Sequence, residues 1–454
     1  MSDLARLRPT SAELREMARL AAPIVLVNVG MQLMGVVDTA MLGRVGAAEI
    51  AAGALGNFYF HLTSIVGIGV LMALDPVVSQ GVGAGDAAAI ARGVQRGVLL
   101  ALLVTVAVCL SFVASGPVLR LLRQPADVVP LAVDYVWWSI PGLLPYFAFN
   151  VMRQTLQAFT RIRPILVAVV VANLLNVGLN WVLIFGHLGF APGGVTGSAQ
   201  ATVLSRWAMA TVLLIAAWPV LRPTLVPWHR ESWHTVPLLR MLALGIPIGL
   251  QFLAEMGAFG LVTVMAGWMG TTTLAGHEVA LSLASMTFMV PLGVAGAAAV
   301  MVGHAVGAGD IAESRRDAVA ALAVGVGFMA LMAVVFALVP DALAAVYTTD
   351  PAAMAMAAAL IPIAAVFQVF DGTQVISTSI LRGAGDTRVA MLLHTLSFWA
   401  VGIPLGALIA FRFDGGAAGL WWGLTAGLAA AAVLQLLRVR HKLGGEVARV
   451  RLDR

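Results

Sequence analysis

The sequence contains little charge and almost no cysteine. Asp, Glu, Lys and Arg together make up only 11% of its 454 residues, whereas soluble domains contain about 25% charged residues. Cys109 is the one cysteine, so an internal disulfide is excluded and the redox compartment cannot be inferred. No HExxH motif is present, which excludes the zinc site that this motif forms on a helix. No polar stretch is long enough to form a soluble domain.

Apolar residues account for 60% of the chain, and they are gathered in long runs. A helix needs about 20 mainly apolar residues to cross about 30 Å of hydrocarbon. Such runs recur along the whole sequence, which predicts an all-α integral membrane protein with twelve transmembrane helices. The predicted spans are residues 20–43, 50–80, 93–118, 128–152, 164–187, 194–218, 241–268, 276–304, 317–340, 352–380, 389–411 and 416–437.

The basic residues indicate the orientation of these spans. With the N-terminus in the cytoplasm, 22 of the 27 Lys and Arg residues lie in cytoplasmic segments, four lie outside, and Arg206 lies within a span. This asymmetry agrees with the positive-inside rule and predicts that both termini are cytoplasmic. It also accounts for the net charge of +5, so we expect the lipid bilayer as a partner and no nucleic acid.

Three pairs of short motifs recur at nearly the same offset. They are VGAGD at 82–86 and 306–310, LQAFTRIR at 156–163 with LRGAGDTR at 381–388, and GGVTG at 193–197 with GGAAG at 415–419. The repeat predicts two six-helix lobes, residues 1–225 with a cytoplasmic N-terminus and residues 226–454 with a cytoplasmic C-terminal tail. Because six is an even number, both lobes keep one orientation, and we expect pseudo-two-fold symmetry along the membrane normal.

Three acidic residues lie inside otherwise apolar spans: Asp38, Glu255 and Asp371. A charge at the centre of a membrane helix costs about 2.5–3.5 kcal/mol on insertion scales, and such residues mark ion, proton or substrate sites. No arginine lies within one helical turn of any of the three along the sequence, so a local ion pair does not explain them. We therefore expect these carboxylates to couple cations or to bind substrate.

Polar and aromatic neighbours extend each acidic position along its helix. Gln368, Asp371 and Gln374 follow one another at three-residue spacing and form one polar stripe. Glu255 lies four residues from a glutamine and from a phenylalanine, so the three stack on one helix face. The supporting site residues that we predict are Asn176, Asn180, Gln251, Phe259, Gln368, Gln374 and His277.

The residue types leave the coupling ion open. Carboxylate and amide oxygens suit a hard cation, so Asp38, Glu255 and Asp371 would be metal ligands if the ion is Na⁺. The same carboxylates, once desolvated, can instead carry protons. Both ions require the same residues, and no other cofactor is expected.

Five longer motifs resemble the MATE (multidrug and toxic compound extrusion) family, and most closely its NorM-type branch. They are VVDTAMLGRVG (36–46), DPVVSQGVGAGD (75–86), GIPIGLQFLAEMGAF (245–259), AGHEVALSLASMTFMVPLGVAGAAAVMVGHAVGAGD (275–310) and FQVFDGTQVISTSILRGAGDTR (367–388). The resemblance implies a twelve-helix, two-lobe antiporter with a V-shaped central cleft. It also implies that the acids in spans one, seven and ten, here Asp38, Glu255 and Asp371, serve cation coupling and drug binding. Some family members carry an acid in span five, where this chain has the amides Asn176 and Asn180.

The expected function is therefore the export of cationic amphipathic drugs by a Na⁺- or H⁺-coupled antiporter that works by alternating access. We expect a monomer in the bacterial inner (plasma) membrane and no enzymatic activity. A lipid-linked sugar flippase is an alternative, but it would favour a basic cleft, and Arg206 is the one mid-span arginine. An intramembrane enzyme is another, although Ser198 has no convincing histidine partner. The two-lobe repeat disfavours a channel.

Overall fold

A computed structural model describes residues 9–453, and all regular secondary structure among them is helical. Residues 1–8 and 454, which belong to the two chain ends expected in the cytoplasm, lie outside the described residues. Twelve helical segments of the described chain are long and apolar enough to cross a membrane. This number confirms the predicted all-α fold with twelve transmembrane spans.

Nine of the twelve segments are single helices. They are α2 (Ser11–Leu42), α5 (Ala87–Val113), α9 (Arg163–Phe185), α10 (Gly194–Leu225), α11 (Thr235–Trp268), α12 (Thr271–Ala308), α13 (Ile311–Leu338), α15 (Pro351–Gly383) and α18 (Gly416–Gly444). The other three are built from consecutive pieces: α3 (Ala47–Leu71) with α4 (Leu74–Gly83), α7 (Val128–Ser139) with η1 (Ile140–Gly142) and α8 (Leu143–Ala158), and α16 (Thr387–Leu396) with η3 (Ser397–Gly402), α17 (Ile403–Ala407) and η4 (Leu408–Arg412). Short helices α6 (Ser115–Leu121), η2 (Arg230–Trp233) and α14 (Pro340–Tyr347) lie between spans.

The repeated VGAGD motif has the same local structure in both copies. The side chain of Asp86 accepts a hydrogen bond from the backbone N–H of Ala89 at 3.0 Å and caps α5. Asp310 caps α13 in the same way through the N–H of Glu313 at 2.8 Å. An aspartate at this position satisfies a backbone donor that the first helical turn leaves free. Both copies of the motif therefore end in an aspartate that caps the start of the following helix.

The helices pack into two compact units. Unit 1 contains the chain up to Val25, Gly83–Gly85 and Leu250–Val450, and unit 2 contains Leu26–Val82, Asp86–Gly249 and the last residues from Arg451. Two of the boundaries fall inside α2 and α11, so each of these helices contributes one part to each unit. The division near residue 225, which the sequence repeat predicts, stays a prediction.

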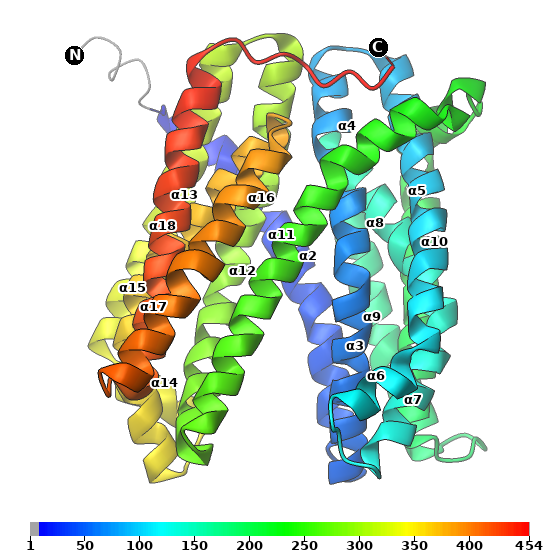
Figure 1. Cartoon of the computed structure of the whole chain (residues 1–454). Coiled ribbons are helices and arrows are strands. Elements are labelled where there is room, and N and C mark those ends of the chain that lie inside the picture. The colour runs from blue at the N-terminus through cyan, green and yellow to red at the C-terminus, as the bar shows by residue number, and fades with distance from the viewer. Residues whose placement is uncertain (1–8, 454) are drawn as a thin grey trace. The chain divides into compact units, whose positions relative to one another are not determined.

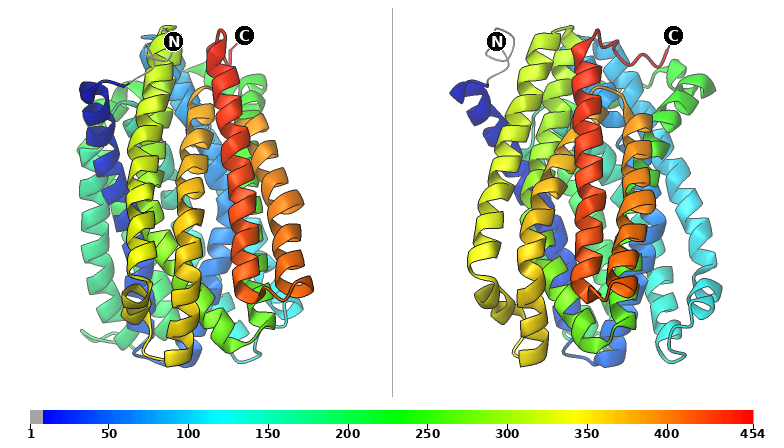
Figure 2. Two further views of the ribbon diagram at one scale, coloured as in Figure 1. Left: turned by 90° about the vertical axis from the view of Figure 1, so that its left-hand side faces the viewer. Right: turned by 60° about the vertical axis from the view of Figure 1, so that its left-hand side comes forward.

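In unit 1, α15 packs against α12, α13 and α18, and α18 also packs against η3, α17 and η4. Figures 1 and 2 show α18 in red beside the orange segment from α16 to η4. Glycines permit this close approach, because a Cβ on Gly423 would overlap the backbone of Gly406, and one on Gly427 would overlap that of Gly402. Small residues at helix interfaces are the usual means of close packing in membranes.

In unit 2, α9 packs against α10, α3 against α7, and α5 against α8. Aromatic rings fill the space between α3 and α8. The Phe60 and Tyr146 ring centroids lie 5.5 Å apart in an edge-to-face arrangement, and Tyr146 lies 5.4 Å from Phe147. Edge-to-face contact is favourable because the positive edge of one ring meets the negative face of the other.

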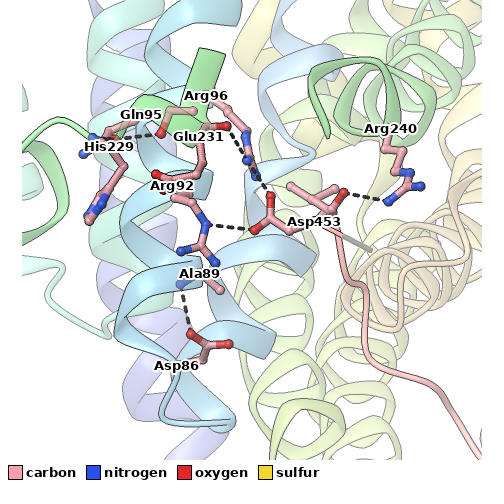
Figure 3. Close-up of polar contacts among 11 residues, drawn as sticks. Asp86, Ala89, Arg92, Gln95, Arg96, His229, Glu231, Arg240 and Asp453 are labelled. Carbon is pink, nitrogen blue, oxygen red and sulfur yellow. Dashed lines mark hydrogen bonds and ion pairs between the residues drawn. The ribbon is translucent and has the colours of Figure 1, made fainter. Parts of the chain in front are cut away.

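The last described residues of the chain dock on unit 2 (Figure 3). The Asp453 carboxylate accepts hydrogen bonds from Arg92 Nε at 2.8 Å and from Arg96 Nη2, and Arg240 Nη1 donates to the Leu452 carbonyl at 2.8 Å. The Arg96 side chain is only 1% exposed. Burial raises the pKa of the Asp453 carboxyl, but the hydrogen bonds and charges of Arg96 and Arg92 outweigh burial and hold that pKa below its ordinary value.

Candidate functional site

Asp38 of α2 lies at the centre of a buried polar cluster in unit 2. Its Oδ1 accepts hydrogen bonds from Asn180 Nδ2 at 2.6 Å and from Asn176 Nδ2 at 3.2 Å, and its Oδ2 accepts one from Thr202 Oγ1 at 2.7 Å. The two asparagines lie one turn apart on α9, and Thr202 is on α10. Asp38 is 8% exposed, and both asparagines are fully buried. The structure thus brings together three of the predicted residues, Asp38, Asn176 and Asn180.

The directions of these hydrogen bonds fit an ionised Asp38. All three neighbours donate and none accepts, and an ionised carboxylate can only accept. Hydrogen bonds from neutral groups replace part of the water that a buried charge loses. Among residues 9–453, no arginine forms an ion pair with Asp38. The cluster therefore stabilises the negative charge without neutralising it, so a proton or another cation can still do so.

A second buried oxygen lies in the same cluster. Asn180 Oδ1 has no hydrogen-bond partner among the described residues, although it is buried. Together with the Asp38 carboxylate and the Thr202 hydroxyl, it makes a group of oxygens of the kind that hard cations prefer. Asn173, one turn before Asn176 on α9, instead donates to the Gly30 carbonyl at 2.9 Å and packs α9 against α2.

Glu255 and Asp371 lie in unit 1, on α11 and α15, where their charges interact. Asp371 is 6% exposed, and within residues 9–453 no group donates a hydrogen bond to it. Glu255 Oε2 lies 3.5 Å from His394 Nε2 of α16, which is too long for a regular hydrogen bond. The Glu255 side chain is 20% exposed, whereas Asp371 is buried. A buried carboxylate without a donor is costly when ionised, so Asp371 favours uptake of a proton or a cation.

His394 joins Glu255 to a buried polar chain. Gln374 Nε2 donates to His394 Nδ1 at 2.9 Å and to Thr378 Oγ1 at 3.0 Å, and Thr378 donates to Gln435 Oε1 of α18 at 2.7 Å. Gln374 contacts one ring nitrogen of His394, and the other, Nε2, faces Glu255. Gln374 was predicted from its spacing to Asp371. In the structure it contacts His394, which in turn faces Glu255.

The remaining predicted residues of unit 1 have separate surroundings. Gln251 Nε2 donates to Thr378 Oγ1 at 3.4 Å, so it reaches the edge of the chain of hydrogen bonds just described. Gln368 Oε1 accepts from Thr287 Oγ1 of α12 at 2.9 Å. Phe259 packs in the apolar core, with its ring 5.9 Å from that of Phe398. These contacts position the helices that carry the acids.

His277 lies in the core of unit 1, away from the hydrogen bonds of the two acids. Its Nε2 contacts Thr263 Oγ1 at 3.0 Å, and its ring centroid lies 5.8 Å from that of Trp421. The side chain is 1% exposed. Neither Glu255 nor Asp371 forms a hydrogen bond or an ion pair with it among the described residues. The structure therefore gives His277 the surroundings of a packed core residue.

The chemistry of the donors limits what ion these clusters can hold. No group of three or more His, Cys, Asp and Glu side chains suited to a metal ion occurs in the described part of the chain. A transition-metal site is therefore not supported by these residues. A Na⁺ ion would need one or two carboxylates completed by neutral oxygens, and unit 2 offers such a set at Asp38.

The sequence interpretation did not select Thr202, His394 or Gln435. Thr202 could have been found, because Ser198, Thr202 and Arg206 form a polar stripe at four-residue spacing on α10. His394 of α16 and Gln435 of α18 lie on helices that carry none of the three acids, and no spacing along their own helices distinguishes them. Only the packing of α16 and α18 against α15 brings them to the acids.

A family model for MatE matches residues 23–182 and 247–408 of the chain. The chain is 36% identical to the probable multidrug resistance protein NorM of Xanthomonas campestris, covering 95% of this chain and 94% of that protein. It is 33% identical to the protein of the same description from Brucella suis, over 94% and 92% of the two chains. It is 31% identical to the multidrug resistance protein MdtK of Pectobacterium atrosepticum, over 96% and 97%.

Solved structures share the fold. The eukaryotic MATE transporter AtDTX14 superposes with a TM-score of 0.86 at 22% identity, covering 94% of this chain and 95% of that one. The bent form of the Vibrio cholerae MATE transporter VcmN superposes with a TM-score of 0.85 at 20% identity, covering 96% and 98%. At these identities the likeness concerns the arrangement of helices.

Proposed function

The chain belongs to the MatE family of multidrug efflux transporters, as its motifs predict, and we propose that it is a cation-coupled antiporter. In this proposal an inward-moving cation, Na⁺ or H⁺, is exchanged for an outward-moving cationic amphipathic compound. The protein works by alternating access, in which its sites are exposed to the two sides of the membrane in turn. The observation that carries the proposal is the buried Asp371 carboxyl, which has no hydrogen-bond donor among residues 9–453.

The acids of unit 1 form the coupling pair in this mechanism. When Asp371 and Glu255 are both ionised, their two negative charges repel each other. A proton or a Na⁺ ion relieves that repulsion, and so does the positive group of a drug. Because cation and drug neutralise the same charges, binding of one opposes binding of the other, which is the requirement for exchange.

Asp38 provides a second cation site in unit 2. Its three hydrogen-bond donors lower the cost of the unoccupied, ionised state. The site can therefore release its cation more readily than Asp371, which lacks such donors. We assign Asp38 to the binding and release of either the coupling ion or the substrate cation.

The membrane potential supplies energy when charge moves inward. A potential of 100 mV is equivalent to about 2.3 kcal/mol for each elementary charge. Exchange of two inward monovalent cations for one outward monovalent drug moves one net positive charge inward. Such a stoichiometry would use the potential as well as the ion gradient.

The setting of the protein is part of the proposal. Its basic residues and its bacterial relatives support the inner membrane as the location, with both termini in the cytoplasm. We propose that it acts as a monomer in the lipid bilayer. No cofactor is required beyond the coupling ion.

The test is drug efflux from proteoliposomes that contain the purified protein. Ethidium transport is measured under an imposed Na⁺ gradient and under an imposed pH gradient, each alone, which identifies the coupling ion. Asp371→Asn should reduce efflux to the level of empty liposomes, because an amide cannot exchange a cation. Asp341→Asn, an exposed acid at the start of α14, is the matched control and should transport normally. Normal efflux by the Asp371 variant, or no efflux by the unmodified protein under either gradient, would reject the proposal.

A further inference from the structure

A cavity of unit 2 lies at the ends of two membrane helices. Its volume is about 670 Å³, and cavities of about 300–1,000 Å³ are usual for small-molecule sites. All of its lining residues belong to unit 2, and they come from the start of α5, from the segment 231–240 that leads into α11, and from the last residues of the chain. Because α5 and α11 are both candidate spans, the cavity lies where two membrane helices begin.

The cavity presents one positive and one negative side chain that no ion pair neutralises. Arg240 and Glu231 both line it and are both exposed. Within residues 9–453, Arg240 donates only to the Leu452 carbonyl, at 2.8 Å, and the Glu231 carboxylate forms no ion pair or hydrogen bond. The other two charged side chains of the lining, Arg92 and Asp453, form an ion pair with each other. A ligand in the cavity therefore meets one unpaired charge of each sign.

The docked tail leaves further donors in the cavity. Arg92 and Arg240 reach the tail from opposite sides (Figure 3). Arg92 contacts Asp453 through Nε at 2.8 Å, and its two terminal nitrogens donate to no group in the described part of the chain. Guanidinium N–H groups are the preferred partners of phosphate oxygens. The positive side of the cavity is thus suited to a phosphate group.

Apolar side chains beside the cavity favour a lipid over a soluble ligand. Trp228 and Trp233 are 39% and 60% exposed, with ring centroids 6.0 Å apart, and tryptophan is enriched where a membrane meets water. Val236, which lines the cavity, Leu239 and Ile246 are also exposed. Their spacings of three and seven residues place them on one face of α11. An apolar stripe therefore runs from the cavity along a membrane helix.

We propose that this cavity binds phosphatidylethanolamine, a lipid whose headgroup carries a phosphate and a primary ammonium. The phosphate binds to Arg240 and to the terminal nitrogens of Arg92, and the ammonium donates to the Glu231 carboxylate. The acyl chains lie along Val236 and Leu239. This lipid site does not depend on which ion and which drug the transporter exchanges.

Other common headgroups satisfy only part of the cavity. Phosphatidylglycerol brings a phosphate but no positive group, so Glu231 stays without a partner and repels it. Phosphatidylcholine carries a positive charge, but its three methyl groups leave no N–H to donate, and an ionised carboxylate can only accept. Phosphatidylethanolamine is the one of the three that supplies both a phosphate and a donor.

Solvated surface charges would make a different prediction. Exposed charged side chains commonly contribute little, and in that case the protein would not distinguish the three headgroups. The purified protein is equilibrated in mixed micelles with equal amounts of the three lipids, all with the same acyl chains, and the first lipid retained is identified by native mass spectrometry. We expect phosphatidylethanolamine to exceed each of the others roughly 3- to 10-fold, the equivalent of one hydrogen bond. Equal retention of the three lipids overturns the proposal.

Variants of Glu231 test the ammonium contact. Glu231→Gln should abolish the preference for phosphatidylethanolamine over phosphatidylcholine. Glu231→Lys should reverse the preference towards phosphatidylglycerol, a gain that misfolding cannot produce. Glu446→Gln, which removes an exposed acid beyond the end of α18, is the matched control and should keep the original preference. An unchanged preference in either Glu231 variant contradicts the assignment.

A variant of Arg240 and a soluble headgroup test the rest of the site. Arg240→Gln should lower retention of all three lipids alike, because each carries the phosphate, and unchanged retention overturns the phosphate contact. Glycerophosphoethanolamine, the headgroup without acyl chains, should displace the lipid only at a concentration on the order of 100-fold higher, because each buried CH₂ group adds about 0.8 kcal/mol. Displacement at equal concentration would assign the cavity to a soluble zwitterion and overturn the lipid.

Discussion

The hydrogen bond from Thr202 to Asp38 gives a quantitative prediction about the charge in unit 2. Valine has nearly the shape of threonine, so Thr202→Val removes the hydroxyl and little else. It leaves Asp38 Oδ2 without its donor at 2.7 Å, while Oδ1 keeps Asn176 and Asn180. A hydrogen bond to a charged group contributes about 1.5–3 kcal/mol, and one between neutral groups about 0.5–1.5 kcal/mol. We expect Thr202→Val to lower the free energy of unfolding by about 1.5–3 kcal/mol.

A double-mutant cycle shows whether this cost depends on charge. In an Asp38→Asn background the lost hydrogen bond joins two neutral groups, so Thr202→Val should cost only about 0.5–1.5 kcal/mol. The difference between the two backgrounds is the coupling between the hydroxyl and the carboxylate. The measurement is a denaturant titration of the purified protein in detergent, in sodium-free buffer, with the free energy taken from the midpoint and the slope.

Thr155→Val is the matched control. Thr155 is also buried in unit 2, but its hydroxyl donates at 2.8 Å to the Val151 carbonyl of its own helix. That carbonyl already accepts a backbone hydrogen bond within α8, so little should be lost. Equal costs for the two threonine variants, or a cost of Thr202→Val that stays the same in the Asp38→Asn background, would refute an ionised Asp38 held by Thr202.

Two further predictions concern helix packing and the C-terminus. Gly423→Ala should destabilise the protein by about 1–3 kcal/mol in a denaturant titration, because its Cβ would overlap the backbone of Gly406. Gly178→Ala, whose Cβ meets nothing within 4 Å, should be neutral or stabilising, and equal costs would contradict the packing argument. Asp453→Asn should speed trypsin cleavage after Arg451 at neutral pH, since the tail loses its charged contacts. An unchanged cleavage rate in the variant would count against docking. The pKa of Asp453 is lowered in the docked tail. Docking should therefore persist above the ordinary carboxyl pKa of about 3.9 and weaken as the pH falls through the lowered value.

The spans could be predicted from the sequence because lipid offers no hydrogen bonds to the backbone. Each crossing segment must satisfy its own N–H and C=O groups, and a helix does so locally. All twelve predicted segments are helices in the structure, although several begin or end elsewhere. The third, predicted as residues 93–118, is α5 (Ala87–Val113), and the separate helix α6 follows it. The hydrophobic pattern fixes where a helix crosses, but helix ends depend on caps and turns.

The candidate site was predictable only in part. Asp38, Glu255 and Asp371 are conspicuous because a charge in an apolar run is costly, and this cost is a local property. Local spacing could not show what His277 contacts, because helical periodicity predicts the face of the helix on which a residue lies but not the helix that packs against that face. In the structure that face packs against Trp421 in the core.

The sequence by itself determined the membrane class, the twelve helices and the three acids within apolar spans, since each depends on the polarity of residues adjacent along one helix. Tertiary structure alone decided which donors reach each acid. Asp38 meets Asn180 and Thr202 from 142 and 164 residues away, whereas Asp371 has no donor among the described residues. It also decided that the Arg206 guanidinium lies over the Phe60 ring. Such pairings depend on how α3, α9 and α10 pack side by side, and the period of a single helix contains no information about its neighbours.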